Sequence, residues 1–260
     1  MAPEESFFGK LPAPGVPFDE ISVHCIRKGT KRLRACLELQ RALEGQLLEM
    51  KELRQSVKTL ARMLADRRDA DVMSDALRKM QAETEDLPTR QLLESLSKAL
   101  DPAHLSASDN REIHQLLKKI ESGTTKLLNP ENNPEAVERL LESRLAALCS
   151  SGEELMDSRN WDALHDWRKL VKKLMYQYPL KLSQSRKDQS VTDALERLGH
   201  SLGNLHDLCL LEDYVLNHRD TSSQSMDTDA FANVLTDIAA NQEQELSQFR
   251  KLFKEFSQLL

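Results

Sequence analysis

Hydrophobic residues recur every three or four positions along most of this chain, which is the spacing of amphipathic helices. One such run consists of Leu47, Met50, Leu53, Val57, Leu60 and Leu64. No segment shows the alternation of apolar and polar residues that marks a half-buried strand. The sequence therefore predicts an all-α protein.

Capping residues and helix breakers divide the first half of the chain. Asp19 or Ser22 can cap a helix that runs to about Leu43, and Gly45 separates it from a second helix over 46–65. Three further helices are predicted: one carries Val72, Met73, Leu77 and Met80, one runs from Pro88 to Pro102, and one is capped by Asp109 and contains Ile113, Leu116, Leu117 and Ile120. The proline- and asparagine-rich stretch 129–134 predicts a boundary between two halves.

Five helices are predicted in the second half, at 135–149, 161–178, 191–202, 205–216 and from Asp227 to the C-terminus. The breaks between them are predicted at Ser151–Gly152, Pro179 and the polar stretches 183–190 and 221–225. The acidic window 227–245 is expected to be a solvated outer face. Residues 1–17 are predicted to be a flexible arm, and 18–260 a single domain with halves of about 18–130 and 131–260.

The composition supports a helical protein and limits its functions. Only 5% of the residues are aromatic and 30% are charged, and the net charge is −6, which argues against general binding to nucleic acid or membrane. The 4 cysteines show no C-x-x-C spacing, so neither structural zinc nor disulfides are expected. No transmembrane run or signal peptide is visible, and we expect a cytoplasmic protein.

A basic helical face stands out against this acidic background. The segment 24–34 carries no acid and contains the cations Arg27, Lys28, Lys31, Arg32 and Arg34. At about 100° per residue, the side chains of His24, Arg27, Lys31 and Arg34 lie within roughly 80° of one another. The apolar residues Ile26, Leu33 and Leu37 lie on the opposite side and are expected to face a core. Such a face is often no more than solvated surface.

The same pattern returns 141 residues later, in His165, Arg168, Lys172 and Lys173. The apolar residues behind this second row are Trp167, Val171, Leu174 and Tyr178. A second echo pairs Leu60, Leu64 and Asp69 with Leu198, Leu202 and Asp207 at an offset of 138. A repeat of both faces is typical of a duplicated unit. The two aspartates are either N-caps of the helices that follow or acids that orient a neighbouring cation.

These motifs resemble the CHAD family, the conserved histidine α-helical domain. The family pattern His-x-x-Arg-x-x-x-Lys/Arg-Arg-Leu-Arg matches the segments that begin at His24 and at His165. Its Leu-Gly-x-x-Arg-Asp element matches Leu64 with Arg68–Asp69, and Leu202–Gly203 with His206–Asp207. The sequence departs from the family at Ala65, Met175 and His206, where glycine, arginine and arginine are usual.

The resemblance implies two pseudo-symmetric four-helix bundles around a central basic cavity that binds inorganic polyphosphate without catalysis. It also implies association with polyphosphate granules. The residues expected to bind phosphate are His24, Arg27, Lys28, Lys31, Arg32, Arg34, Arg68, His165, Arg168, Lys169, Lys172, Lys173, Tyr176 and His206. No cofactor and no metal is expected.

Other functions remain open. The alternative is a metal-dependent phosphohydrolase or phosphotransferase, which would need carboxylates that hold a divalent metal near the phosphates. Among the basic rows only Asp166 is acidic, and no P-loop is present. A metal site at His24 and His165 is disfavoured because the neighbouring cations would repel a metal ion. Nucleic acid is expected to bind only as weak cross-reactivity.

Overall fold

The computed structural model describes residues 8, 18–45, 48–100, 107–127, 134–181, 185–221 and 228–260. All regular structure in these ranges is helical, which confirms the all-α prediction. The helices are α1 (Glu20–Glu44), α2 (Leu48–Met63), α3 (Ala65–Glu83), α4 (Leu87–Ala99), α5 (Ala107–Leu127), α6 (Pro134–Glu153), α7 (Trp161–Gln177), the 3₁₀ turn η1 (Tyr178–Leu180), α8 (Arg186–Thr221) and α9 (Thr228–Ser257). Within the described ranges, no helix is long and apolar enough to cross a membrane.

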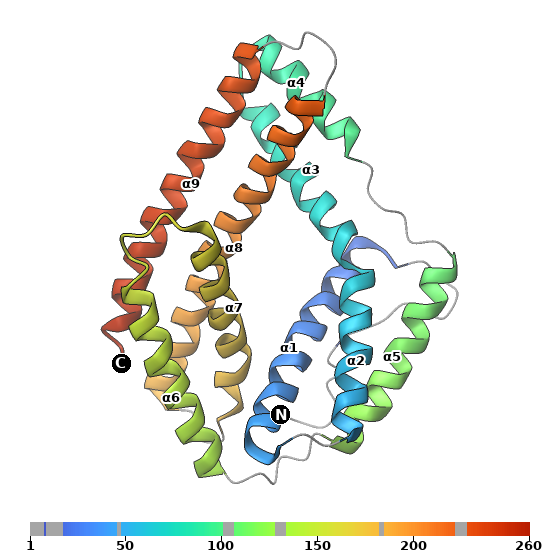
Figure 1. The fold of residues 1–260 in the computed structure, drawn as a ribbon, viewed down its shortest axis with the longest axis vertical. Helices are drawn as coiled ribbons and strands as arrows, with labels where there is room; N and C mark the ends of the chain where they lie inside the picture. The colour runs from blue at the N-terminus through green and yellow to red at the C-terminus, as the bar shows by residue number, and fades with distance from the viewer. Residues whose placement is uncertain are drawn as a thin grey trace.

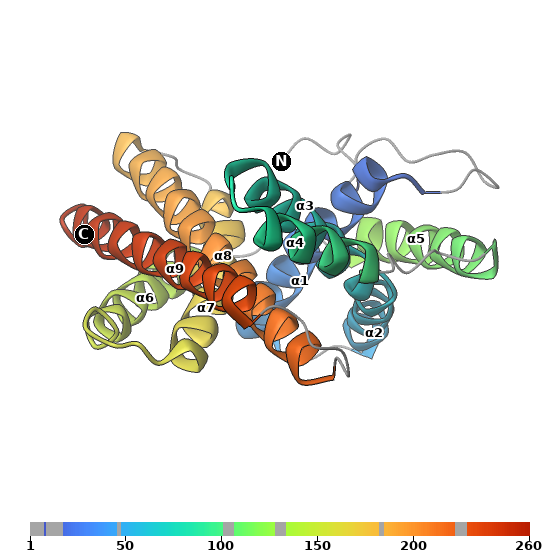
Figure 2. The same cartoon turned by 90° about the horizontal axis from the view of Figure 1, so that it is seen from above.

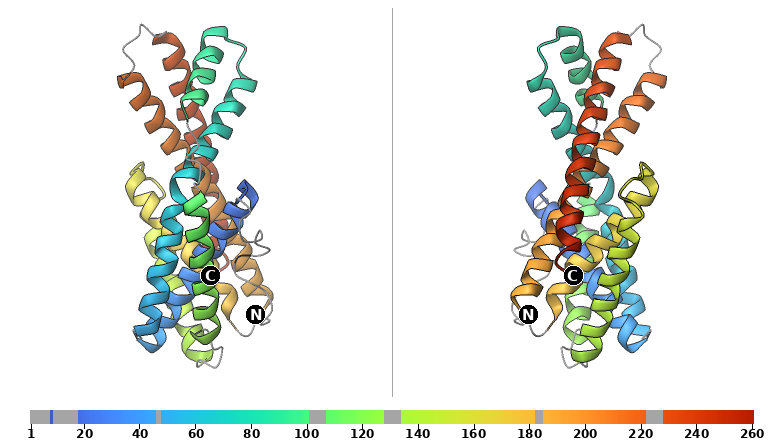
Figure 3. Two further views of the ribbon diagram at one scale, coloured as in Figure 1. Left: turned by 90° about the vertical axis from the view of Figure 1, so that its right-hand side faces the viewer. Right: turned by 90° about the vertical axis from the view of Figure 1, so that its left-hand side faces the viewer.

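The molecule is elongated, and its helices form two sides that meet at both ends (Figure 1). The first side consists of α1, α2 and α5, and the second of α6, α7 and the lower parts of α8 and α9. The helices α3 and α4 join the upper parts of α8 and α9. Seen from above, α4 lies next to α9 (Figure 2). Side views show the α3–α4 and α8–α9 pairs crossing at an angle (Figure 3).

The apolar faces predicted from the sequence form the cores of the two sides. Ile26, Leu33 and Leu37 are fully buried against α2 and α5. Trp167 and Val171 are buried in a second core, which α6, α7, α8 and α9 share. Both predicted apolar stripes are therefore confirmed.

A third apolar core joins the two halves of the chain. It contains Leu77 of α3 and Leu93 of α4 from the first half, and Leu211, Phe231 and Val234 from the second. The buried residues form three clusters, and two of them contain residues of both halves, since Leu39 of α1 belongs to the second core. The division into two four-helix bundles is therefore not confirmed. That division stays a prediction.

The two helices predicted over 191–202 and 205–216 are one continuous helix, α8. The prediction of a break there was wrong because Gly203 lies within the helix. Among the described glycines, positive φ occurs at Gly45, at 85°, and not at Gly203. Buried Leu198, Leu202 and Leu205 continue one apolar face across the glycine. Asp207 therefore lies inside a helix, and its interpretation as an N-cap is wrong.

The corresponding segment of the first half is divided at Leu64, which lies between α2 and α3 with φ −102° and ψ 2°. Leu64 is the residue that precedes α3, so Asp69 lies in the second turn of that helix and is not its N-cap. At the offset of 138, the first residue of α2 corresponds to the first residue of α8, and the last residue of α3 to the last of α8. A duplicated unit would give this correspondence.

The polar stretch predicted as a loop over 183–190 begins α8 instead, from Arg186 onward. The backbone N–H of Ser185 donates to Asp188 Oδ2 at 2.9 Å, and that of Asp188 donates to Ser185 Oγ at 3.1 Å. This reciprocal pair is a capping box, which starts a helix in a polar sequence. Burial alone would raise the pKa of Asp188, but the hydrogen bonds from Ser185 and Lys181 hold that pKa well below its usual range.

The break predicted at Ser151–Gly152 is also absent, because α6 continues through both residues. Gly152 is needed for close packing rather than for a turn. A Cβ atom there would overlap the ring of Phe253 and lie 2.7 Å from Trp167 Cζ2. The glycine thus lets α6 approach α7 and α9.

The remaining predictions have mixed outcomes. Asp19 caps α1 by accepting from the Ser22 N–H at 2.8 Å, and Gly45 ends that helix, as expected. The window 227–245 is not a wholly solvated face, because Phe231, Val234 and Ile238 are buried. The boundary predicted at 129–134 lies outside the described residues except for Pro134, where α6 begins. The arm predicted over 1–17 also lies outside them, except that Phe8 is buried.

Replacing Gly152 with alanine should destabilise the fold by about 1–3 kcal/mol, since the new methyl group overpacks the contact with Trp167 and Phe253. Gly203→Ala is the matched control, because a Cβ there meets no atom within 4 Å. This second substitution should stabilise α8 by about 0.5–1 kcal/mol. Urea denaturation of both variants measures the two effects. Equal stability of the two variants would contradict the close-packing role of Gly152.

Candidate anion-binding site

The first basic row lies along α1 and is open to solvent. His24, Lys28, Lys31, Arg32 and Arg34 are exposed. In the described part of the chain, no carboxylate lies within ion-pair distance of Lys28, Arg32 or Arg34. Cations without a nearby carboxylate attract anions more strongly than paired ones, because no fixed acid competes for them.

Arg27 differs from its neighbours because it is half-buried and also has a structural contact. Its guanidinium donates to the carbonyl oxygen of Leu64, at the junction of α2 and α3. Carbonyls at a helix end lack their usual helical partner, and an arginine is well suited to satisfy one. Arg27 therefore fixes the junction of α2 and α3 as well as adding charge to the row.

The helices α1 and α7, which carry the two rows, cross in contact (Figure 1). At the crossing, the fully buried side chain of Gln177 donates from Nε2 to the carbonyl oxygen of Ala35 at 2.7 Å. Its Oε1 accepts from the guanidinium of Arg144, on α6, also at 2.7 Å. One amide therefore holds α1, α6 and α7 together.

A carboxylate reinforces this crossing. Glu38 of α1 pairs with Lys173 of α7 at 3.0 Å and with Arg144 of α6 at 3.4 Å. All three side chains are partly exposed, so the pairs stabilise the fold only modestly. The pairing means that a phosphate at Lys173 would compete with Glu38 for the ammonium group.

The second basic row, on α7, is less exposed than the first. Its residues His165, Arg168, Lys172 and Lys173 are half-buried, and Lys169 beside them is exposed. Lys169 pairs with Asp166 at 2.8 Å. The second row is therefore partly covered and partly neutralised.

The side chain of Lys172 lies against the backbone of α8 at Gly199. A Cβ at that position would lie 3.1 Å from Lys172 Nζ and 3.2 Å from its Cε. The glycine thus leaves room for the lysine stem between α7 and α8. Nothing in the sequence motifs singled out Gly199 for this contact.

Tyr176 lies within the electrostatic reach of both rows. Burial raises the pKa of its hydroxyl, while Arg32 on α1 and Arg168 on α7 both act to lower that pKa. Glu196 on α8 acts in the opposite direction to the arginines. The hydroxyl of Tyr176 therefore experiences the charge of one arginine from each row.

His165 and His206 contact each other between α7 and α8, with their ring planes tilted by 43°. Their Nδ1 atoms are 3.1 Å apart, and their ring centroids are 4.4 Å apart. Burial lowers the pKa of His165, and the nearby cations Lys169 and Arg168 lower it further. The structure thus brings together two predicted site residues that are 41 positions apart in the sequence.

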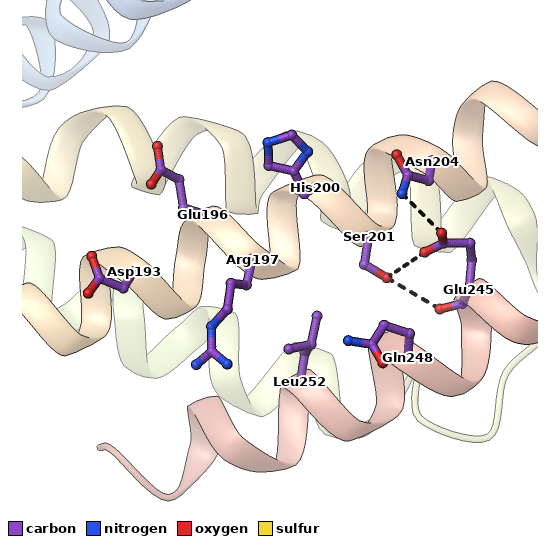
Figure 4. Close-up of a pocket in the computed structure, with 9 residues that line it drawn as sticks. All are labelled: Asp193, Glu196, Arg197, His200, Ser201, Asn204, Glu245, Gln248 and Leu252. Atoms are coloured by element: carbon purple, nitrogen blue, oxygen red, sulfur yellow. Dashed lines mark hydrogen bonds between the residues drawn. The ribbon is translucent and has the colours of Figure 1, made fainter.

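Of the two hollows described on the molecule, the larger lies away from both rows and the smaller borders the second row. A groove of about 580 Å³ runs between α8 and α9, and its lining residues are Asp193, Glu196, Arg197, His200, Ser201, Asn204, Glu245, Gln248 and Leu252 (Figure 4). A second hollow of about 170 Å³ lies between α6 and α7, where Lys173 is the predicted site residue among its lining side chains. The central basic cavity therefore stays a prediction.

Sequence reasoning missed the residues that hold the two rows in position. Gln177 lies on the buried side of α7, and an amide among apolar residues was the available signal. Glu38 lies one turn after Arg34, and its pairing with Lys173 had no signal in the sequence. The side chain of Arg68 lies outside the described part of the structure. No group of three His, Cys, Asp or Glu side chains suited to a metal ion occurs among the described residues.

These features define a class: a helical protein whose two cationic helices cross in contact. A family model described as the CHAD domain matches residues 15–216. The chain therefore belongs to the CHAD domain family.

A solved structure, the crystal structure of the CHAD domain from the plant Ricinus communis, has a similar fold. It aligns with a TM-score of 0.64 and 18% sequence identity over 91% of this chain and 82% of that chain. At this identity the likeness concerns the fold. The comparison with curated proteins returned no match.

Replacing Gln177 with leucine should lower the free energy of unfolding by about 1–3 kcal/mol, because the buried hydrogen bond to the Ala35 carbonyl is lost and the partly buried guanidinium of Arg144 loses its amide acceptor. Gln244→Leu changes an exposed residue of α9 in the same way and should change stability by less than about 0.5 kcal/mol. Thermal and urea unfolding of the two variants decide the matter. A Gln177→Leu variant as stable as the parent would show that this amide does not hold the crossing.

Proposed function

We propose that this protein binds inorganic polyphosphate, without catalysis, along the two basic rows on α1 and α7. The observation that carries the proposal is the contact between these two helices, with the Gln177–Ala35 hydrogen bond of 2.7 Å at the crossing. Because the helices touch there, a flexible anionic chain can contact both rows at once. Family membership supports the same proposal.

The dimensions of the rows suit a repeating anion. From the crossing near Arg34, the first row extends ten residues to His24, which is about 15 Å of helix. Rigid helices hold their cations at fixed intervals, and a polyanion with one charge on each phosphate meets several of them in succession. Arginine can make a bidentate contact with phosphate oxygens. Arg32 and Arg34 are available for this contact because no described carboxylate pairs with them.

The carboxylates next to the rows favour binding over chemistry. Asp166 pairs with Lys169, and Glu38 pairs with Lys173 and Arg144. Carboxylates engaged in this way help to order cations rather than to hold a catalytic metal near the phosphates. Contacts that are equal for every phosphate of the chain stabilise the ground state and the transition state alike, so they do not accelerate cleavage. Association with polyphosphate granules would follow from such binding.

Removing two unpaired cations should weaken binding strongly. In the variant Arg32→Gln/Arg34→Gln, two charge-assisted contacts of about 1.5–3 kcal/mol each are lost, so affinity should fall by about a hundredfold or more. Lys51→Gln/Lys58→Gln removes the same charge from exposed positions of α2 and serves as the control. Arg27 is retained because it also supports the junction at Leu64. Equal affinities of the two double variants would refute the assignment of the α1 row.

Salt should weaken binding of long-chain polyphosphate steeply. Each neutralised phosphate releases a condensed counterion, and the logarithm of the association constant should fall by about 0.7 per contact for each tenfold rise in salt, as for single strands. Titrations at graded salt and at graded chain lengths measure the number of contacts. An affinity that does not change with salt would argue decisively against an electrostatic site.

No cleavage of polyphosphate is expected when the protein is incubated with long chains and magnesium or manganese. Gel analysis of chain length and an assay of free phosphate follow the reaction over time. His24→Ala and His165→Ala are the controls for a contaminating enzyme. Shortening that requires either histidine would favour the phosphohydrolase alternative.

A further inference from the structure

The contact between His165 and His206 restricts how many protons the two rings can hold. A hydrogen bond between Nδ1 atoms that are 3.1 Å apart requires one donor and one acceptor. The accepting ring is therefore neutral, with its proton on Nε2. If both rings become cations, the hydrogen bond is lost and two positive charges face each other at a centroid distance of 4.4 Å.

The surroundings act mainly against the second charge. On α7, burial disfavours the charged form of His165, and Lys169 and Arg168 oppose it as nearby cations. Asp166 and Asp162 favour the charged form, but the carboxylate of Asp166 is already paired with Lys169. On α8, Asp207 follows His206 in the chain. The surroundings of His165 therefore disfavour a pair in which both rings are positively charged, and an additional negative charge nearby would favour it.

The internal repeat gives this pair a particular meaning. At the offset of 138, His206 corresponds to Arg68 of the first half. The first half thus has a permanently charged side chain where the second half has a histidine, whose charge depends on protonation. With histidine in place of arginine, the charge at this position of the repeat depends on pH and on nearby charges.

We propose that the His165–His206 pair is a proton-linked subsite, at which the protein takes up a proton when a polyanion binds. This inference rests on the proposed polyphosphate binding. Phosphates near the pair favour its charged form, so the pKa of the pair is higher in the complex than in the free protein. By linkage, affinity increases as the pH falls through the range between these two pKa values.

The test compares affinities for long-chain polyphosphate at pH 6 and pH 8, at one ionic strength. Long chains keep the proportion of titrating terminal phosphates small. The parent protein should bind about tenfold more tightly at pH 6, since one further charge-assisted contact forms. Isothermal titration in two buffers of different ionisation enthalpy should show net proton uptake at the intermediate pH.

Two substitutions at one position imitate the two protonation states. His206→Asn is always neutral at this position, so it should bind more weakly than the parent at pH 6 and show a smaller change of affinity between pH 6 and pH 8. His206→Arg restores the permanent cation of the repeat and should bind tightly at both. His200→Asn, at an exposed position of the same helix in the groove lined by Glu245, is the control and should keep the full pH dependence.

The outcomes separate the two proposals. If polyphosphate binds at neither pH, the proposed function fails. If it binds, and both His206 variants keep the parent's tenfold pH dependence and proton uptake, the function stands and the proton-linked pair is wrong. Thermal unfolding of each variant shows which are folded. If His206→Arg does not fold, His206→Asn and the proton uptake of the parent protein still decide the question.

Discussion

A single buried amide, that of Gln177, fixes the geometry on which the proposed site depends. Its side chain is fully buried where α7 crosses α1, and an amide in that position is costly unless its donor and acceptor are both satisfied. The carbonyl of Ala35 and the guanidinium of Arg144 supply the two partners. Because these partners belong to different helices, the amide sets the register at which α1, α6 and α7 meet. The separation of the two basic rows follows from this register.

The two halves of the chain touch at two places whose contacts differ in character. At the crossing, buried Leu39 of α1 packs into the core of the second half, and Glu38 adds polar pairs to cations of α6 and α7. At the other end the contact is an apolar core that includes Leu93 and Phe231. The apolar contact supplies burial without directional preference, whereas the polar contact specifies an orientation. At the crossing Glu38 pairs with Lys173 and Arg144, whereas Arg34 beside it and Lys28 farther along α1 have no carboxylate partner in the described part of the chain. The capacity to attract an anion therefore lies along the open row of α1.

The repeat has changed differently in its two copies. The junction at Leu64 interrupts the first copy, and the guanidinium of Arg27 satisfies its carbonyl oxygen. The second copy has a continuous helix through Leu202, so the same carbonyl needs no such donor. A histidine at position 206 then makes its contact with His165. One half therefore carries fixed charges on an exposed row, and the other carries a half-buried row with a titratable pair.

The sequence by itself determined the helical class, the cap at Asp19, the end of α1 at Gly45 and the buried faces of Ile26 and Trp167, because these depend on local periodicity and local hydrogen bonds. It also predicted the two basic rows. Where glycine was taken as a break, the tertiary structure decided otherwise: Gly152 permits close packing against Trp167, and Gly203 continues a helix. The contacts of Gln177 with Ala35, of Glu38 with Lys173 and of His165 with His206 join residues on different helices. No local pattern encodes such contacts, since they depend on how the helices pack.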